Sequence, residues 1–268
     1  MANFSPLVDV MMTAARKGAR TLSRDFGEVE NLQVSRKGPA DFVTAADKMA
    51  EEKIFESLRH DRPGYGYLLE ERGEVGGSDK THRFIIDPLD GTTNFMRGNP
   101  HFAISIGVER EGVLHAGVVY DVIRDEMFFA ETGKGAFLVD GRGVEKRLRI
   151  PPRDDLTICT IATGSPFRGK PGHAKFLTEL HKVMAQTAGI RRNGSAALDL
   201  AWLAAGRYDG FWERRLNAWD IAAGIVIVRE AGGIVQDLDT GAADDVLASG
   251  NLLCASENLL PKLEKLLS

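Results

Sequence analysis

The chain has 268 residues, 43% of them hydrophobic and 27% charged, which is ordinary for a globular protein and excludes a disordered or fibrous chain. Its 34 Lys and Arg against 38 Asp and Glu give a net charge of -4, so nucleic acid is not the expected partner. No apolar run approaches the roughly 18 residues of a membrane helix, so no membrane partner is expected either.

The cysteines and the start of the chain indicate a cytoplasmic location. Cys159 and Cys254 lie in apolar runs that are typical of buried strands, and two thiols cannot form a disulfide framework. The opening Met-Ala-Asn-Phe-Ser-Pro lacks the basic and apolar regions of a secretion signal. We therefore expect a reducing, cytoplasmic environment.

The first half of the chain is predicted to combine helices with an antiparallel meander. Apolar residues at three- and four-residue intervals predict an amphipathic helix over 7–26, and a second helix is expected over about 45–58. Short apolar runs separated by turn residues then predict strands. These strands are expected at 83–86, 103–109, 113–120, 126–130 and 136–139.

After residue 150 the pattern changes to strands that alternate with helices. Strands are predicted at 157–162, 209–212, 234–238 and 252–255, and helices at 172–186, 195–205, 220–231 and 258–267. We therefore predict an α+β protein, a layered α-β-α-β-α sandwich in which an antiparallel half, 1–150, packs on an α/β half, 151–268. A site between the two halves is expected.

The informative motif is Asp-Pro-Leu-Asp-Gly-Thr-Thr-Asn-Phe at 87–95, which follows an apolar strand. Its two carboxylates are hard oxygen ligands for a cation, and the helix that could start at Gly91 and Thr92 would offer backbone N–H groups to a phosphate. Pro88 predicts that the strand gives way to a bend here. The motif therefore indicates a cation site beside a phosphate site.

Two further acidic residues could complete this cluster: Glu70 in the pair Glu70-Glu71, and Asp220 at the start of a long apolar helix. If they converge with Asp87 and Asp90, each close pair would repel by about 4 kcal/mol at ~4 Å and an effective dielectric of about 20. Only divalent cations make such an arrangement tolerable. With oxygen ligands and a phosphate to share, Mg2+ is the first choice of ion.

Each of these signals has an ordinary structural reading when it is taken alone. Asp-x-x-Asp-Gly is often a turn, Glu70-Glu71 is often a solvated pair, and Asp220 is often a helix cap; the full run in its context favours a site. The six histidines show no zinc-binding spacing. The arginine pairs 191–192 and 214–215 could form a basic face for RNA or a protein, although such residues are more often solvated or paired.

These motifs resemble those of the inositol monophosphatase family, the Mg2+-dependent, Li+-sensitive phosphatases. The run 87–95 is similar to that family's first signature, and 219–224 followed by 230–233 is similar to its second. Supporting stretches at 41–47, 70–71, 191–197 and 208–213 extend the resemblance over nearly the whole chain, closest to its bacterial extragenic-suppressor branch. The resemblance also implies a homodimer.

The resemblance implies a role for each matching residue, with two or three Mg2+ ions in the site. Most metal ligands would lie in the first half, and the second half would supply the substrate side and the last ligand. The first ion would be held by Glu70, Asp87 and the carbonyl of Leu89, the second by Asp87, Asp90 and Asp220, and a third, weaker ion would lie beside Glu70. Thr92 and Asp47 would help to deprotonate the attacking water, the amides of Gly91 and Thr92 would bind phosphate, and Gly194, Ser195, Ala196, Glu213 and Arg191 would line the polyol side, with Asp90 and Asp220 also facing the substrate.

The expected activity is hydrolysis of a small phosphorylated polyol, first of all myo-inositol monophosphate, by in-line attack of a metal-activated water. Alternatives are fructose 1,6-bisphosphate, phosphoadenosine phosphate or histidinol phosphate as substrate, or a regulatory role in binding RNA or a transcription complex. A haloacid-dehalogenase-like phosphatase, which uses an aspartate nucleophile, ranks lower. Its two aspartates are separated by one residue near the chain start, whereas here two residues separate Asp87 from Asp90.

Overall fold

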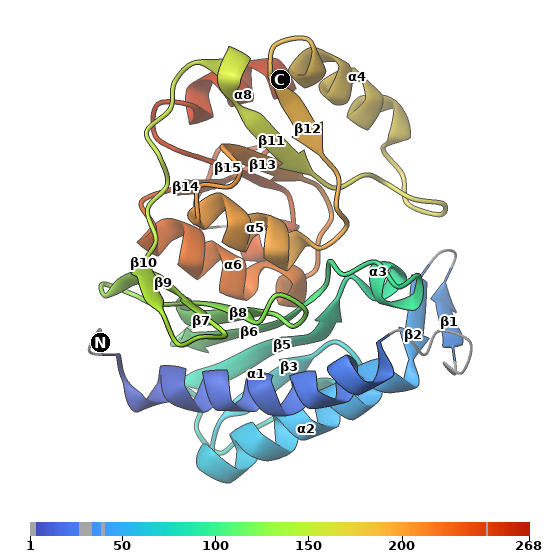
Figure 1. Ribbon diagram of the computed structural model, residues 1–268, viewed down its shortest axis with the longest axis vertical. Helices are drawn as coiled ribbons and strands as arrows, with labels where there is room; N and C mark the ends of the chain where they lie inside the picture. The colour runs from blue at the N-terminus through green and yellow to red at the C-terminus, as the bar shows by residue number, and fades with distance from the viewer. Residues whose placement is uncertain (1–3, 27–33, 39–40, 245) are drawn as a thin grey trace.

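The computed structural model describes residues 4–26, 34–38, 41–244 and 246–268. In Figure 1 these residues form the predicted five layers of helix and sheet, α-β-α-β-α. Helices α1 and α2 cover one sheet, α5 and α6 lie between the two sheets, and α4 and α8 cover the second sheet. The helix bounds are α1 Pro6–Asp25, α2 Ala45–Asp61, α3 Thr92–Met96, α4 His173–Met184, α5 Ala196–Ala204, α6 Ala218–Glu230, α7 Val246–Ser249 and α8 Leu260–Leu267.

The outer helices α1 and α2 form where the apolar periodicity predicted them. Pro6 opens α1, whose buried residues recur every three or four positions and face the sheet. The two helices pack closely, because a Cβ at Gly18 of α1 would come only 2.7 Å from the Ile54 side chain of α2. The first turn of α2 carries Asp47.

The larger sheet has eight strands in the order β10-β9-β8-β7-β6-β5-β3-β4. From β5 to β9 it is the predicted antiparallel meander, and β3 joins it parallel to β5. Its strands are β3 Gly66–Leu69, β4 Gly73–Val75, β5 His82–Asp90, β6 Ala103–Arg110, β7 Val113–Asp121, β8 Glu126–Glu131, β9 Gly135–Asp140 and β10 Glu145–Arg147.

Strand β5 is longer than the predicted 83–86, and the irregularity expected at Pro88 lies inside it. The strand continues to Asp90, and its register against β6 shifts between Asp87 and Asp90. Pro88 is tolerated because β3 pairs with β5 only as far as Ile86, so the missing N–H of proline interrupts no ladder on that side. The bend expected at this point is therefore an irregularity inside a strand.

The middle layer brings the second half of the chain against the first. Helix α6 packs on β6 and β7, where sheet glycines make room for it: a Cβ at Gly107 would lie 2.7 Å from the Cβ of Ala222. The Ser105 hydroxyl donates a hydrogen bond of 3.1 Å to the carbonyl of Trp219, and this bond anchors the start of the helix. Asp220 is thereby held over the eight-stranded sheet.

The second sheet has five strands in the order β12-β11-β13-β15-β14, with β12, β11 and β13 parallel. Its predicted first strand begins late, because Asp155 accepts the amide of Thr157 and caps a 3-10 turn, η2 Leu156–Ile158. Residues 150 and 151, the predicted domain boundary, fall between β10 and η2; the division itself stays a prediction. The strands are β11 Thr160–Thr163, β12 Gly189–Arg191, β13 Gly210–Glu213, β14 Ile234–Asp237 and β15 Leu252–Ala255.

Several short elements were not predicted. These are a two-stranded sheet, β1 Val34–Gly38 with β2 Asp41–Thr44, together with β3, β4, β10, β12 and α7, whereas α3 begins at Thr92, where a helix start was expected. Cys159 and Cys254 are buried and free, as expected. Within the described ranges, no helix combines the length and the apolar character needed to cross a bilayer.

Candidate active site

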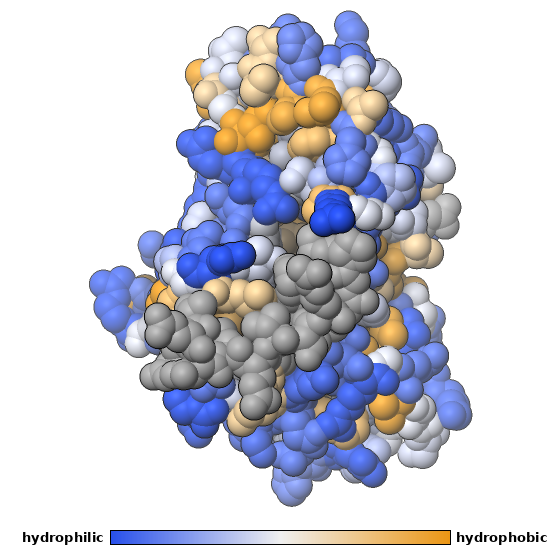
Figure 2. Space-filling model, turned by 90° about the vertical axis from the view of Figure 1, so that its right-hand side faces the viewer, coloured by the Kyte–Doolittle hydropathy of each residue, from blue (hydrophilic) through white to orange (hydrophobic). Residues whose placement is uncertain are grey.

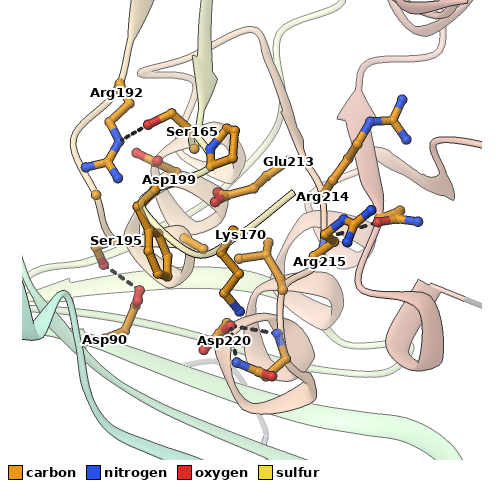
Figure 3. Close-up of a pocket in the computed structure, with 18 of the residues that line it drawn as sticks. Asp90, Ser165, Lys170, Arg192, Ser195, Asp199, Glu213, Arg214, Arg215 and Asp220 are labelled. Carbon is orange, nitrogen blue, oxygen red and sulfur yellow. Dashed lines mark hydrogen bonds between the residues drawn. The ribbon is translucent and has the colours of Figure 1, made fainter. Parts of the chain in front are cut away.

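A cavity of about 770 Å³ lies where the end of β5 faces the second half of the chain, and Figure 3 shows the side chains that enter it. The structure brings nearly all of the predicted site residues to its wall. Two of them do not line it: Asp47 lies just behind the wall, and Arg191 lies on the edge strand β12. Those that do are Glu70, Asp87, Leu89, Asp90, Gly91, Thr92, Gly194, Ser195, Ala196, Glu213 and Asp220.

The end of β5 turns abruptly into the short helix α3. Asp87 is only 3% exposed, and its Oδ1 accepts the amide of Leu89 at 2.9 Å. Gly91 has a φ of 100°, a left-handed conformation that glycine adopts without strain. A Cβ there would also lie 3.1 Å from the carbonyl oxygen of His101. Glycine therefore allows the turn that places two carboxylates beside the first turn of a helix.

Thr92, in the first turn of α3, contacts Asp47 in the first turn of α2. The Thr92 hydroxyl lies 3.2 Å from Oδ1 of Asp47 and 3.2 Å from the carbonyl oxygen of Leu89, with hydrogen-bond geometry to both. Asp47 is fully buried. The predicted hydrogen-bonded pair is therefore present, and Thr92, which carries its hydroxyl, lines the cavity.

Asp90 connects the two halves of the chain. Its Oδ2 accepts the Ser195 hydroxyl at 2.6 Å and the Ala197 amide at 2.7 Å (Figure 3). Ser195 caps the start of α5, so the same serine holds both the helix and the carboxylate. These contacts explain how residues far apart in the sequence come to face one cavity.

The other two acidic residues enter from separate elements. Glu70 follows β3, and its amide donates a 3.2 Å hydrogen bond to the carbonyl of Ile86 on β5. Asp220 is the third residue of α6, and its Oδ2 accepts the Asn217 amide at 2.7 Å in a capping box. The sequence reading of Asp220 as a helix cap is thus correct, and the residue also lines the cavity.

Glu70, Asp87, Asp90 and Asp220 are called the acidic floor below, and in it burial and neighbouring negative charges oppose the ionisation of the three aspartates. Burial, followed by the charges of the other three, raises the pKa of Asp87 well above its usual range. Burial raises the pKa of Asp90 to about 6 even though Ser195 and Ala197 stabilise its charged form. Burial and the charge of Asp90 raise the pKa of Asp220 to about 8. The acidic floor therefore carries electrostatic repulsion that a cation would relieve.

The donor set of the acidic floor fits Mg2+, which prefers carboxylate and carbonyl oxygens. Asp90 and Asp220 direct oxygens toward Ser195 and Asn217, whose hydrogen bonds they accept. Among the described residues, accordingly, no three His, Cys, Asp or Glu side chains stand in a ready-made metal geometry. Ion binding would require modest rotations of these carboxylates, which the repulsion among them favours.

The second half of the chain forms the opposite wall of the cavity. Burial raises the pKa of Glu213, on β13, to about 8, while the nearby Arg192 opposes this shift. Glycine at position 164 leaves room for the Glu213 carboxylate, because a Cβ there would overlap it as it now lies. Arg192 lines the cavity, whereas the guanidinium of Arg191 donates a 2.9 Å hydrogen bond to the carbonyl of Ile190.

Sequence reasoning missed several cavity residues. Asn94 bridges the halves, since its Nδ2 donates to the carbonyl oxygens of His101 and Asn193 at 2.7 Å each. Asp199 is buried 4.0 Å from the His101 ring, and burial raises its pKa well above the usual range. Asn94 lies in the recognised signature and could have been singled out there; Asp199 sits in a helix whose apolar run gives no signal. Lys170, Arg192 and Arg215 also line the cavity.

Comparisons with known proteins agree with this geometry. The model of the inositol monophosphatase family matches residues 3–268. An inositol-1-monophosphatase of Caulobacter vibrioides is 55% identical over 94% of this chain and 97% of its own length. The crystal structure of the extragenic suppressor protein suhB of Bartonella henselae superposes with a TM-score of 0.94 at 52% identity, covering 98% of this chain and 99% of that one. The Nus factor SuhB of Escherichia coli is 41% identical over 95% of this chain and 93% of its own length.

Proposed function

This chain belongs to the inositol monophosphatase family, and we propose that it is a Mg2+-dependent phosphoric monoester hydrolase acting on a small phosphorylated polyol, first of all myo-inositol monophosphate. One observation carries the proposal: the acidic floor, where burial and neighbouring charges raise the pKa of Asp87, Asp90 and Asp220, shares a cavity with the Thr92 hydroxyl and the first turn of α3. Carboxylates, a cation and backbone amides suffice for phosphoryl transfer, which depends chiefly on positioning and charge neutralisation.

In this proposal the acidic floor would hold two Mg2+ ions. Glu70, Asp87 and the Leu89 carbonyl would bind one, Asp87, Asp90 and Asp220 would bind the other, and a third, weaker ion would lie beside Glu70. When bound, Mg2+ neutralises phosphate charge and acidifies water. The fit rests on the all-oxygen donor set and on the desolvated, mutually repelling carboxylates.

The protein's own groups orient the phosphate and move the proton. We assign phosphate binding to the amides of Gly91 and Thr92, in the turn where α3 begins. Thr92 Oγ1 can accept a proton from the attacking water while it passes its own to Oδ1 of Asp47, 3.2 Å away. Water attacks in line, and no side chain of the protein becomes phosphorylated.

The polyol is proposed to lie against the second half of the chain. Glu213 and residues Gly194 to Ala196 line that side of the cavity and offer hydrogen-bonding groups to hydroxyls, next to Asp90 and Asp220. For Arg191 the same role rests on the family resemblance alone. Arg191→Gln and Arg192→Gln, compared on the same substrate, separate the two arginines: the larger rise in KM identifies the one that contacts the polyol.

Phosphate release from myo-inositol 1-phosphate, with and without Mg2+, tests the proposal. The wild type should turn over only with Mg2+, and Asp90→Asn should be inactive while Asp61→Asn, at an exposed position, should match the wild type. Equal and negligible rates in all three proteins would refute the activity. A substrate panel with fructose 1,6-bisphosphate, phosphoadenosine phosphate and histidinol phosphate then ranks the alternatives by kcat/KM. Millimolar Li+ should inhibit turnover.

A regulatory role is a second candidate, favoured by the 41% identity to the Nus factor SuhB of Escherichia coli. Here the chain would bind RNA or a transcription complex. Co-purification with RNA polymerase, compared between the wild type and the inactive Asp90→Asn, tests it: retention of both supports a binding role independent of catalysis.

We also propose a homodimer in the cytoplasm. The outward face of α4 supports the dimer, since Leu177 and Met184 are 62% and 57% exposed, and Figure 2 shows apolar surface in the upper part of this side. Two buried free thiols accord with a reducing compartment. Sedimentation of the wild type and of Leu177→Lys tests the dimer. The wild type should sediment as a dimer and the variant as a monomer, and a variant that remains dimeric would exclude this face as the interface.

A further inference from the structure

Hydrolysis of a polyol phosphate releases a strongly basic alkoxide, and this leaving oxygen needs charge neutralisation or a proton. The groups assigned above act elsewhere: Thr92 and Asp47 act on the attacking water, and the amides of Gly91 and Thr92 bind the phosphate. An in-line displacement places the leaving oxygen opposite the attacking water. The leaving oxygen therefore faces the second half of the chain, where the polyol is proposed to lie.

Several cationic side chains of the second half line the cavity, but two of them are neutralised within the chain. Arg214 forms ion pairs with Glu179 at 2.7 Å and with Asp239 at 2.5 Å, and Lys175 pairs with Asp239 at 3.2 Å. Lys170 takes part in none of the ion pairs found in the described part of the chain. Its ammonium therefore carries a charge that a substrate can use.

A tight turn in the loop between β11 and α4 presents Lys170 to the cavity. The Lys170 amide donates to the Phe167 carbonyl at 3.0 Å, and Gly169, the third residue of this turn, has a φ of 94° that glycine adopts without strain. The ammonium lies 5.5 Å from the centre of the Phe167 ring, a favourable position over an aromatic face. The turn and the ring together restrict where the ammonium can lie.

The Lys170 ammonium points into the cavity, toward Asp220 of the acidic floor (Figure 3). It stops short of the Asp220 carboxyl, because the ion pairs of the described residues do not join the two. The space between them belongs to the cavity that both residues line. A leaving oxygen next to Asp220 would therefore lie between the ammonium and the acidic floor.

We propose that Lys170 is a catalytic residue that acts on the leaving oxygen of the polyol. As the bond between phosphorus and this oxygen breaks, the ammonium donates a hydrogen bond to the oxygen and then its proton, so that the polyol leaves as a neutral alcohol. The lysine regains a proton from solvent, and the phosphate keeps the oxygen of the attacking water. This inference rests on the proposed function, because the phosphate that is hydrolysed must be bound at the acidic floor.

The test compares two phosphate esters whose leaving groups differ in basicity. Myo-inositol 1-phosphate releases an alkoxide, whereas the nitrophenolate of p-nitrophenyl phosphate leaves without a proton. Lys170→Gln should lower kcat for the inositol ester by about a hundredfold, the lower end of what a general acid contributes. The kcat for the nitrophenyl ester should stay within about threefold, which also shows that the variant is folded and loaded with metal. Arg168→Gln, an exposed cation of the same turn outside the cavity wall, is the matched control and should change neither value.

Dependence on the leaving group distinguishes a catalytic lysine from a structural one. Equal losses of kcat on both esters, or no loss on the inositol ester, would overturn the role of Lys170 while leaving the phosphatase intact. In calorimetric titration, Lys170→Gln should bind Mg2+ as the wild type does; a changed affinity would show that the ammonium acts on the metal ligands and would overturn its role at the leaving oxygen as well. Absence of Mg2+-dependent phosphate release from both esters in the wild type would instead remove the proposed function, and the role of Lys170 with it.

Discussion

The negative charges of buried and half-buried carboxylates are stabilised differently in two regions of this protein. On the eight-stranded sheet away from the cavity they meet arginines: Glu109 pairs with Arg83 at 2.7 Å, and Glu126 with Arg207 at 2.5 Å. In the acidic floor, the side chains of Asp87, Asp90 and Asp220 accept hydrogen bonds from amides and a hydroxyl. The carboxylates of the first region are paired with arginines of the same chain, whereas those of the second have raised pKa values, and we propose that a cation from outside the chain neutralises them.

Removing one carboxylate of the acidic floor should have the largest effect. Asp87→Asn preserves the shape but removes the charge that the other three oppose, so kcat/KM should fall by about a thousandfold or more. The melting temperature without metal should not fall, because the lost charge was a source of repulsion. Phosphate release and thermal unfolding in EDTA measure both. A variant that is active yet less stable would show that Asp87 is an ordinary structural carboxylate.

Removing the Thr92 hydroxyl, which lies in the cavity beside the acidic floor, should have the next largest effect. Thr92→Val deletes the donor to Asp47 while keeping a β-branched side chain of similar size. Loss of proton transfer predicts a fall in kcat of about a hundredfold. Thr92→Ser, which keeps the hydroxyl, serves as the control and should retain most of the activity. Equal kcat values for Val and Ser would exclude the proposed proton path.

His101, behind the cavity wall, is a buried base, so it offers a comparison with the buried carboxylates. Burial, and secondarily the charge of Arg124, lowers the pKa of His101 to about 4. The unfolded chain, with a pKa near 6.5, binds more protons between these values. The contribution of the neutral His101 side chain to the free energy of unfolding, on the order of 3 kcal/mol, is therefore complete above about pH 6.5 and is lost as the pH falls toward 4.

Urea unfolding at several pH values measures this contribution. The wild type should lose free energy of unfolding between pH 6.5 and 4 more steeply than His101→Gln, which has no titrating group at this position. Parallel curves for the two proteins would show that the imidazole titrates normally in the folded state.

Breaking an ion pair with arginine on the sheet should have the smallest effect on activity and stability. Glu126→Gln removes one partner of the bidentate pair with Arg207, at the surface of the sheet. Pairs of this kind contribute about 0–1 kcal/mol, so the free energy of unfolding should change by no more than that and kcat/KM should stay unchanged. A drop in activity comparable to that of Asp87→Asn would erase the distinction between the two regions.

The layered fold could be predicted because its main elements have strong periodic signals. Helix α1 shows apolar residues at helical spacing, and the strands of the meander end at recognisable turns. Strand β3, of four residues, is too short to produce a pattern, yet its pairing with β5 as far as Ile86 is what lets the strand continue through Pro88. The sequence therefore predicts the irregularity at Pro88 but not the continuation of the strand to Asp90, which depends on this long-range pairing.

The candidate site was predicted best where residues lie in one contiguous motif. Asp87 to Thr92 are adjacent in sequence, whereas the contact of Asp90 with Ser195 joins residues 105 positions apart and follows from no local pattern. Which of Arg191 and Arg192 faces the cavity depends on how the strand β12 is oriented. This strand has only three residues, too few for the alternation of polar and apolar side chains to show its orientation. Lys170 and Arg215 lie in loops, where the sequence does not indicate which way their side chains point.

Calorimetric titration of Mg2+ into the metal-free protein tests the central claim most directly. The account predicts saturable binding of about two ions to the wild type, with binding lost or strongly weakened in Asp87→Asn, because Asp87 is the residue that faces all the other carboxylates of the acidic floor. Glu126→Gln should bind as the wild type does. Identical isotherms for the wild type and Asp87→Asn would contradict the claim that the acidic floor is a metal site.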